Sequence, residues 1–362
     1  MINSKKKGFT IVELVIVIAV IAVLSAVLIP TFSNLVKKAN MSADQQAVRQ
    51  MNTALAMYEA ENGKAEYLGI VKEALDSQGI NAYDPNVATP VSKGYVFCWN
   101  PEDGKIYIVE ANKKPDNYKL LTDNEIKASD NATTALEAGG TVTLLENIVL
   151  DQGNVDLSKD LTIIGQGENP IEIKSTDENA LRLFNIISSD VELTLENVKI
   201  VLDNGQDANA ENGTARAIST TGGEDQPALK NVVINLINVT IESCGYGLNL
   251  TGGVDGAKVN IKNSTITAFQ PINVYADNTQ ISIDSCAING VYTNGEYNGG
   301  CIAMYPEAQN TYITVNNTTF TGTNTSECKI LVFCIWSGSN CGYNATNSTY
   351  NGEAYDSSKH IN

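Results

Sequence analysis

Leu193-Thr194-Leu195-Glu196-Asn197-Val198-Lys199-Ile200 is one copy of an eight-residue template that recurs in the second half of the chain. Four more copies begin at Ile234, Val259, Ile281 and Ile313. In each copy apolar and polar residues alternate on both sides of a central Asn or Ser, where the alternation changes phase. Because successive side chains of a strand point to opposite faces, this pattern predicts two short strands joined by a one-residue corner.

The spacing of the copies predicts a solenoid. Their first residues (193, 234, 259, 281 and 313) lie 41, 25, 22 and 32 residues apart. The shortest spacings fit one coil of a parallel β-helix, with three strands and three turns, and the longer ones fit a coil with insertions or two coils. Coils stacked about 4.8 Å apart would bring the corner residues into register. We therefore expect a ladder of amides bonded to their neighbours above and below, formed by Asn197, Asn238, Asn263, Ser285 and Asn317.

This repeat, with Leu161–Gly167 following the run Thr141–Leu150, resembles the right-handed pectin-lyase-like β-helix family. The resemblance spans residues 130 to 355 and implies a fold rather than an activity. It places a parallel β-helix domain at 130–362. A β-propeller or a sandwich is the alternative, but irregular insertions between well-kept octets favour the solenoid.

The other decisive stretch is Met1–Pro30, in which Lys5-Lys6-Lys7-Gly8 precedes an apolar run. Between Phe9 and Ile29 the only ionisable residue is Glu13. Those 21 residues span about 30 Å as a helix, the thickness of one bilayer core. By the positive-inside rule, the three lysines stay on the cytoplasmic side of the membrane, and the rest of the chain lies across it. A secretory signal or simple anchor is the alternative, but a carboxylate inside the hydrocarbon costs about 2.5 kcal/mol or more and calls for a partner.

This stretch resembles the type IV prepilin leader. The resemblance implies cleavage between Gly8 and Phe9 by a prepilin peptidase and N-methylation of Phe9. It implies that Glu13 neutralises the α-amino group of a neighbouring pilin subunit, and that the protein passes from a single-pass cell-membrane form to a pilus or the cell surface. Residues 1–8 are then the leader, and 9–62 form a membrane and assembly helix ended by Asn62-Gly63.

Residues 63–129 read as a small pilin-like α/β head and linker. Tyr67–Gln78 has helical periodicity, and Gly94–Trp99 and Lys105–Val109 alternate as two strands joined by a turn. Asn112–Asp130 reads as the linker. The predicted fold class is therefore α+β multidomain: a long N-terminal helix, the small head and the β-helix.

Composition excludes several functions. A formal charge of −17 with three arginines makes nucleic-acid binding improbable, because phosphates are neutralised by Lys and Arg. The only histidine, His360, and the lack of a Cys-x-x-Cys pair disfavour zinc sites and Ser/His or Cys/His catalysis. Seven cysteines leave at least one thiol unpaired within the chain. We expect no cofactor other than Ca²⁺, for which Asp203, Asp207 and Glu211 are weak candidates.

Three insertions follow the template at the same turn: Val201–Gly213, Asn289–Gly300 and Thr321–Glu327. Loops on a rigid scaffold commonly hold binding sites. A Tyr ring can stack on a sugar ring while an Asn amide bonds its hydroxyl groups, so these loops could bind sugars. The candidate ligand-binding residues in these loops are Asp203, Asn209, Tyr292, Asn294, Tyr297 and Asn298.

Three hypotheses follow. The first is a type IV pilin-like surface protein, a minor or tip subunit that displays an adhesive, glycan-binding β-helix. A body subunit is less favoured, because every repeat of the filament would have to accommodate a domain of this size. The second is a displayed polysaccharide lyase in which Arg216 is the base and Ca²⁺ assists. The third is a purely architectural surface protein anchored by its uncleaved helix.

Overall fold

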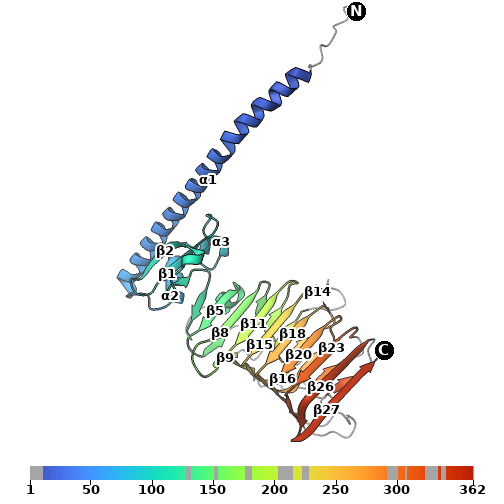
Figure 1. The fold of residues 1–362 in the computed structure, drawn as a ribbon. Helices are drawn as coiled ribbons and strands as arrows, with labels where there is room; N and C mark the ends of the chain where they lie inside the picture. The colour runs from blue at the N-terminus through green and yellow to red at the C-terminus, as the bar shows by residue number, and fades with distance from the viewer. Residues whose placement is uncertain are drawn as a thin grey trace, which may run out of the picture. The chain divides into compact units, whose positions relative to one another are not determined.

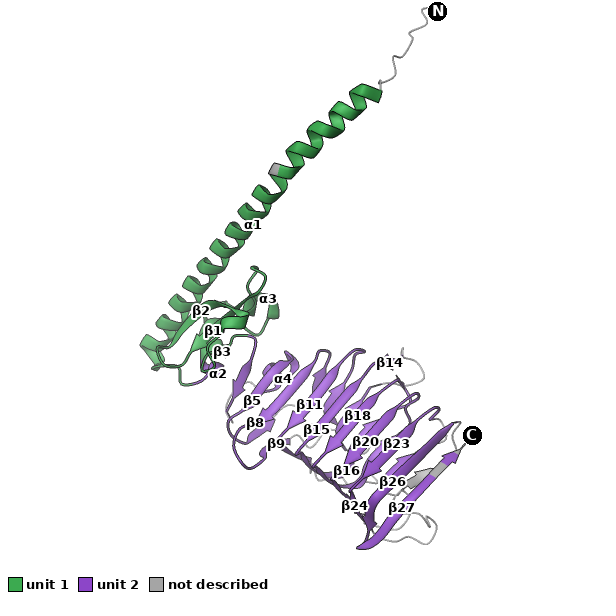
Figure 2. Ribbon diagram, in the orientation of Figure 1, with its two compact units in different colours: residues 1–66, 71–121 green, residues 67–70, 122–362 purple. Residues whose placement is uncertain are grey.

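The computed structural model of the protein describes residues 11–127, 132–150, 154–175, 182–202, 215–221, 228–291, 301–305, 308–322, 333–335 and 340–361. The chain divides into two compact units (Figure 2). Unit 1 comprises residues 1–66 and 71–121, and unit 2 comprises residues 67–70 and 122–362. Unit 2 therefore begins at Thr122 rather than at residue 130, and it includes Tyr67–Ile70, where the Leu68 backbone N–H donates to the Glu125 carboxylate (2.9 Å).

Unit 1 combines a long helix with a small three-stranded antiparallel sheet in the order β2-β1-β3 (Figure 1). The turn between β1 and β2 closes with Gly104 at φ 72°, a backbone conformation that favours glycine. Its elements are α1 (Ile11–Asn62), α2 (Leu68–Ser77) apart from its first three residues, α3 (Pro85–Ala88), β1 (Tyr95–Asn100), β2 (Lys105–Glu110), η1 (Ala111–Lys113) and β3 (Lys119–Leu120).

The expectation that Asn112–Asp130 is a linker is wrong. Lys119 of β3 pairs with Trp99 of β1, so β3 completes the sheet of unit 1. Only four residues later, β4 (Asn124–Ile126) pairs in parallel with β5 of unit 2. A two- or three-residue strand held by backbone pairing carries too few side chains to show a periodicity.

Unit 2 is a large, mostly parallel β domain, consistent with a β-helix. Among the described residues, 22 strands join one sheet, and only β26 and β27 (Glu353–Ile361) pair antiparallel within it. A complete coil contributes one strand to each of three sides, and each strand pairs in parallel with the equivalent strand of the next coil. Side 1 begins with β4 and continues with β5 (Gly140–Leu144), β8 (Leu161–Gly165), β11 (Glu192–Glu196), β15 (Val233–Ile237), β18 (Lys258–Lys262), β20 (Gln280–Asp284), β23 (Tyr312–Asn316) and the first half of β26 (Cys341–Tyr350).

Sides 2 and 3 follow in the same way, and β16 and β19 run across both. Side 2 consists of β6 (Ile148–Leu150), β9 (Ile171–Ser175), β12 (Val198–Leu202), the first halves of β16 (Thr240–Leu250) and β19 (Thr265–Val274), β21 (Ala287–Gly290), β24 (Thr319–Gly322) and the end of β26. Side 3 consists of β7 (Val155–Leu157), β10 (Arg182–Ile186), β13 (Arg216–Thr220), the second halves of β16 and β19, β22 (Ile302–Met304) and β25 (Phe333–Ile335).

The octets form strands and corners as the alternation predicts. Leu193, Leu195, Val198 and Ile200 are all fully buried, and Asn197 turns the corner from side 1 to side 2 at φ 55°. Short polar side chains tolerate this left-handed conformation best after glycine. The same conformation (φ 49–57°) occurs at Asn238, Asn263, Ser285, Asn317 and Asn347.

The expected amide ladder at this corner is mostly absent among the described residues. The Asn238 amide donates to Asn197 Oδ1 (2.9 Å), but the Asn317 amide reaches Asp284 instead (3.4 Å). What repeats is a backbone bond: each corner N–H donates to the carbonyl that precedes the corner of the next coil, as Asn197 does to Ile237 (3.1 Å). Asn therefore occurs at this corner mainly because it tolerates the left-handed φ angle, and less because its side-chain amide bonds the next coil.

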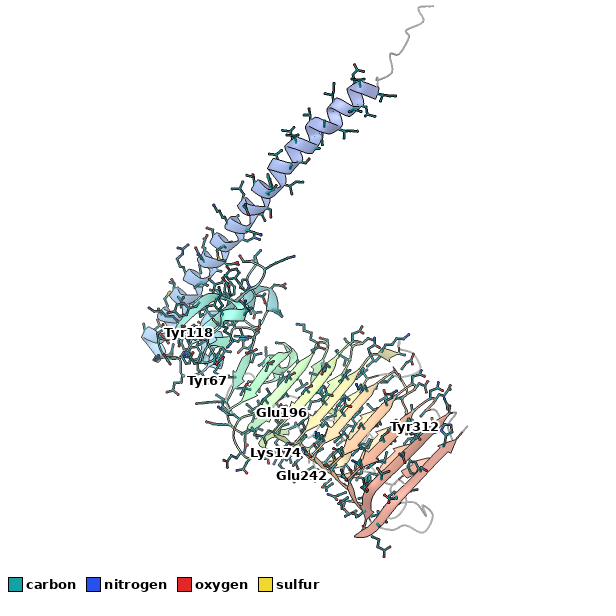
Figure 3. All side chains as sticks on the ribbon, viewed as in Figure 1. Tyr67, Tyr118, Lys174, Glu196, Glu242 and Tyr312 are labelled. Atoms are coloured by element: carbon teal, nitrogen blue, oxygen red, sulfur yellow. The ribbon has the colours of Figure 1, made fainter. Side chains whose placement is uncertain are left out.

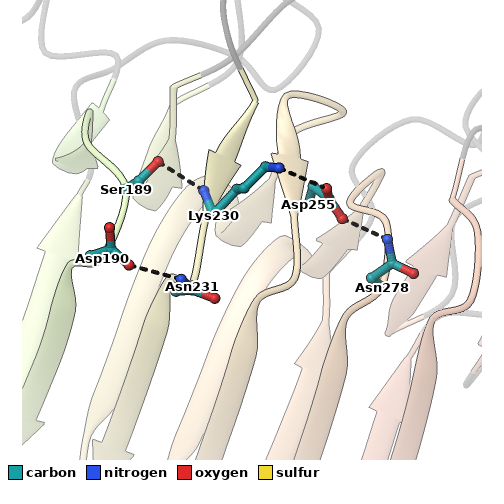
Figure 4. Close-up of polar contacts among 6 residues, drawn as sticks. All are labelled: Ser189, Asp190, Lys230, Asn231, Asp255 and Asn278. Carbon is teal, nitrogen blue, oxygen red and sulfur yellow. Dashed lines mark hydrogen bonds and ion pairs between the residues drawn. The ribbon is translucent and has the colours of Figure 1, made fainter.

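The more regular side-chain ladder lies at the corner from side 3 to side 1. Asn310 donates to Asn278 (3.0 Å), and Asn340 donates to Asn310 (2.9 Å). Earlier along the stack, Asp255 accepts from the Asn278 amide (2.6 Å) and lies 3.9 Å from Lys230 Nζ (Figure 4). The sequence carries this signal, because each of these asparagines stands three residues before the first inward residue of side 1.

A further element is added at each end of the described stack. At the first coil, α4 (Ala132–Glu137) buries Ala132, Ala135 and Leu136 and contacts β4, β6 and β7. At the last coil, β27 adds an antiparallel strand to β26. The short pair β14 (Leu229–Lys230) and β17 (Val254–Asp255) lies beside the corner from side 3 to side 1.

Candidate assembly segment and ligand surfaces

The N-terminal half of α1 exposes an apolar surface. Ile11 is 81% exposed, Leu24 is 54% exposed and Phe32 is 69% exposed, whereas Met51 and Leu55 further along the helix are buried. Among the described residues α1 is the one helix long and apolar enough to cross a membrane. Glu13 lies in its first turn, and Gly8 and Phe9 lie outside the described residues.

The C-terminal half of α1 is fixed to the rest of unit 1 by buried polar contacts. The Asp44 carboxylate is 2% exposed and accepts from the backbone N–H groups of Val91 (2.8 Å) and Ser92 (2.9 Å). The Asn52 amide donates to the Ile106 carbonyl and accepts from the Ile106 N–H, both at 2.8 Å. These contacts satisfy backbone groups of the edge strand β2 and of the segment before β1, and they attach the C-terminal half of α1 to the small sheet of unit 1.

All of the predicted ligand-binding residues in the insertions lie outside the described residues: Asp203, Asp207, Asn209, Glu211, Tyr292, Asn294, Tyr297 and Asn298. Their flanking strands are described. The three insertions leave β12, β21 and β24 on side 2 and return at β13, β22 and β25 on side 3. They therefore depart from one edge of the stack, as the sequence predicts.

Arg216 lies on β13, where it is in register with Arg182 of β10 and Tyr246 of β16. Its guanidinium stands 5.8 Å from the centre of the Tyr246 ring, and its buried Nε–H has no hydrogen-bond partner among the described residues. Burial lowers the pKa of Arg216, and the neighbouring charge of Arg182 lowers it further. Within the described residues neither arginine forms an ion pair, so two cations share one end of side 3.

A row of asparagines (Asn185, Asn249 and Asn273) runs along side 3. Each alternates with residues such as Phe184 and Ile218 that face the core. The Asn185 amide donates to Asp156 (2.7 Å), and the Asn273 amide donates to Asn249 Oδ1 (2.6 Å). The asparagines of this row are 6% exposed or less. Sequence analysis missed the row, although Asn between two apolar residues recurs in Phe184-Asn185-Ile186, Leu248-Asn249-Leu250 and Ile272-Asn273-Val274.

The outward face of side 1 carries an accessible groove of ≈ 460 Å³ across β18, β20 and β23. Tyr312, 41% exposed, forms one wall of it (Figure 3). It stands in register with Gln280 on the neighbouring strand and Gly342 on the next. The remaining lining is polar and includes Lys258, Asn260, Ser282 and Thr314. Sequence analysis missed Tyr312, although the residue before each octet faces outward.

The described residues contain no group of three His, Cys, Asp or Glu side chains able to hold a metal ion. Among the described residues, Cys98 of unit 1 and Cys286 and Cys301 of unit 2 are buried and form no disulfide. Burial raises the pKa of Cys301 to about 12, and its thiol donates to the carbonyls of Thr321 (3.3 Å) and Ile288 (3.7 Å). Cys286 and Cys301 therefore pack as small buried side chains within unit 2.

Comparison with known proteins places the N-terminal segment. Residues 3–29 match the prokaryotic N-terminal methylation motif. The chain is 35% identical over 69 residues to a type IV major fimbrial protein FimA of Dichelobacter nodosus, covering 18% of this chain and 44% of that protein. It is 39% identical over 60 residues to prepilin peptidase-dependent protein D of Escherichia coli (17% and 41%). It is 30% identical over 121 residues to the type IV major pilin protein PilE1 of Neisseria gonorrhoeae (33% and 52%).

The chain spans about half the length of the curated relatives it matches. The N-terminal part of the chain therefore carries a type IV pilin N-methylation motif and is similar to type IV pilins.

Proposed function

We propose that this chain is a type IV pilin-like subunit, anchored in a membrane by α1 before it joins a filament. The supporting observation is the exposed apolar half of α1, with Glu13 as its only ionisable residue before Lys37, in the segment that matches the methylation motif. An apolar helical surface of this length requires lipid or neighbouring helices around it.

The proposal includes processing by a prepilin peptidase. The Gly8–Phe9 bond is cleaved, Phe9 becomes the N-methylated first residue, and Glu13 pairs with the α-amino group of an adjacent subunit. In a low-dielectric assembly an unpaired carboxylate is costly, so such pairing would select the axial register of the helices.

A prediction about maturation follows. Co-expression of the full chain with a prepilin peptidase is expected to give a mature protein that begins at Phe9, read by intact-mass and N-terminal peptide analysis. Glu13→Ala is expected to lower incorporation into filaments without reducing membrane insertion, and Leu14→Ala, which truncates an exposed neighbour, is the matched control. An unprocessed chain, or normal incorporation of Glu13→Ala, would refute the respective step.

We also propose that unit 1 is a small pilin-like head and that unit 2 is a right-handed, pectin-lyase-like β-helix displayed by a minor or tip subunit. A domain that extends from Thr122 to the end of the described chain is large relative to the helix that anchors it. Occasional or terminal placement in a filament accommodates such a domain more easily than placement at every repeat.

For unit 2 we propose adhesion to extracellular glycans. The groove beside Tyr312 supports this proposal, since an exposed aromatic face can stack on a sugar ring while amides and hydroxyls on neighbouring strands bond its hydroxyl groups. The insertion residues named above are further candidates. Metal binding by Asp203, Asp207 and Glu211 stays an expectation.

A glycan array probed with the full chain in detergent tests this assignment. Binding that falls at least about tenfold in Tyr312→Ala and persists in Tyr118→Ala, an aromatic truncation in unit 1, supports the groove; one such stacking contact is worth about 1–3 kcal/mol. Binding unaffected by Tyr312→Ala would move the site to the insertions. Absence of any binding would favour the architectural hypothesis.

The lyase hypothesis is favoured by a single observation, the lowered pKa of Arg216 beside Arg182. Incubation with polygalacturonate and Ca²⁺, followed at the absorbance of unsaturated products, tests it. Product that is lost in Arg216→Ala would establish the enzyme, and absence of product would remove this alternative.

A further inference from the structure

A groove of ≈ 750 Å³ lies in unit 1 between α1 and the segment that precedes β1. Its apolar lining is exposed: Phe32 is 69% exposed, Val36 48% and Val91 64%. Three side chains of this size, open to solvent on one concave surface, indicate that something other than water covers them.

The rim of this groove is basic. Lys37, Lys38 and Lys93 line it, and none of them forms an ion pair with a described residue. Between Leu14 and Ala43, Lys37 and Lys38 are the only ionisable residues. The nearest acid along the helix, Asp44, already accepts from two backbone N–H groups. A chain of net charge −17 thus carries an unopposed positive cluster at this place.

A buried hydroxyl belongs to a residue that lines the same groove. Ser92 is 8% exposed, and its Oγ is buried and has no hydrogen-bond partner among the described residues. Its backbone N–H is held by Asp44, so the residue is fixed in place. A buried hydroxyl without a partner costs free energy, and a ligand oxygen would satisfy it.

The position of the groove along α1 indicates the ligand. The inference rests on the proposed function, in which α1 spans the membrane. Ile11–Ile29 gives about 28 Å of apolar helix, close to one hydrocarbon core. Phe32 then lies at the boundary of the hydrocarbon, and Lys37 and Lys38 lie about 11 Å beyond Pro30, from where long side chains reach back to the headgroup layer.

We propose that this groove binds the headgroup of an anionic phospholipid while the chain resides in the membrane. The phosphate is held by Lys37, Lys38 and Lys93 and accepts a hydrogen bond from Ser92 Oγ. The glycerol and the first acyl carbons cover Phe32, Val36 and Val91. A second copy of the chain is a poorer occupant, because a symmetric contact would bring two such lysine clusters together without a countercharge.

Photolabelling in nanodiscs tests this inference. The full chain, at one copy per disc, is exposed to phosphatidylglycerol or phosphatidylcholine carrying the same photoreactive group near the phosphate, and the labelled peptides are identified by mass spectrometry. Phosphatidylglycerol is expected to label residues 32–41 and 89–95 about tenfold more than phosphatidylcholine. The variant Lys37→Gln/Lys38→Gln/Lys93→Gln should abolish this preference, and Ser92→Ala should reduce it.

The matched control is Lys159→Gln/Lys230→Gln/Lys262→Gln, which removes three exposed lysines of unit 2 and should keep the preference. Equal labelling by the two lipids, or a preference that survives the first triple variant, would overturn the inference. Photocrosslinks between two copies through residues 91–95, in discs that hold two, would assign the groove to a subunit contact instead. Alkaline carbonate extraction separates the two proposals: a chain that is extracted refutes the membrane span, whereas a retained chain without lipid preference refutes only this groove.

Discussion

Leu, Ile and Val are exposed in the N-terminal half of α1 and buried in the coils of unit 2. Leu24 is 54% exposed and Val23 is 67% exposed, whereas Leu195 and Ile200 are fully buried. In α1 the apolar residues are continuous, so they surround the helix and no single face can cover them. In the octets they alternate with polar residues, so each coil buries its own apolar set against the next.

This difference shows that unit 2 buries its apolar side chains within the chain, whereas the exposed half of α1 needs lipid or other helices to cover its apolar side chains. The stack gains its hydrophobic stabilisation internally, at about 25 cal/mol per Å² buried. The exposed half of α1 gains nothing comparable until lipid or other helices surround it. The most informative experiments change the same residue type in both regions and compare the results.

The largest expected contrast is between Leu195→Ala and Leu24→Ala. Truncation of the buried Leu195 should lower the free energy of unfolding of unit 2 by about 2–5 kcal/mol, because it removes contacts and leaves a cavity. Leu24→Ala should leave that free energy within about 0.5 kcal/mol. Urea denaturation of the full chain in mild detergent, followed by near-ultraviolet circular dichroism, measures both. Similar values for the two variants would mean that α1 takes part in the cooperative unit.

A smaller contrast separates the two contributions of a corner asparagine. Asn238 and Asn263 share the left-handed conformation (φ 53° and 49°), but only Asn238 forms a described amide bond to its neighbour in the stack, Asn197. Asn→Ala at either position should cost about 1–2 kcal/mol through the φ angle. Asn→Gly keeps that angle accessible, so Asn238→Gly should cost about 1 kcal/mol more than Asn263→Gly. Equal costs for the two glycine variants would show that the amide bond contributes nothing measurable.

The octets could be predicted from the sequence because their signals are local: alternation fixes burial, and a left-handed corner restricts the residue type. The position of β3 could not be predicted, because a two-residue strand is too short to show alternation. The pairing of Lys119 with Trp99 depends instead on the fold of unit 1. The groove at Tyr312 could not be predicted for the same reason. The neighbours of Tyr312 on the adjacent strands, Gln280 and Gly342, lie 32 and 30 residues away in sequence. The long apolar helix could be predicted from the sequence, since Glu13 and the apolar run lie within one helix.

Two buried thiols extend the comparison between the units to pH. Burial raises the pKa of Cys301 in unit 2 to about 12 and that of Cys98 in unit 1 to about 11, whereas an unfolded thiol titrates near 9. Between pH 9 and 12 the unfolded chain has lost the Cys301 proton and the folded chain retains it, so stability falls as pH rises. Cys301→Ala should reduce the loss of stability from pH 8 to pH 10 by about 1 kcal/mol relative to the unaltered chain.

Denaturation at the two pH values measures this effect, and Ser264→Ala, which removes a buried hydroxyl that does not titrate in this range, is the control that should leave the loss unchanged. Alkylation gives an independent check: at pH 8 Cys301 should react far more slowly in the folded chain than in the unfolded chain. Early labelling of Cys301 in the folded protein would mean that its coil opens locally.

The smallest expected effect concerns charges on the outside of the same stack. Lys199 Nζ lies 2.9 Å from Glu242 and 3.7 Å from Glu172, on neighbouring coils of side 2, and a hydrogen bond to Glu242 raises its pKa. The contribution of this pairing is present at neutral pH and is lost as pH rises through that raised pKa. Because the side chain remains 31% exposed, Lys199→Gln should cost no more than about 1 kcal/mol, less in 1 M salt, while Lys262→Gln should cost about nothing. A cost near that of Leu195→Ala would mean that ion pairs between coils, rather than the buried apolar rows, hold the stack together.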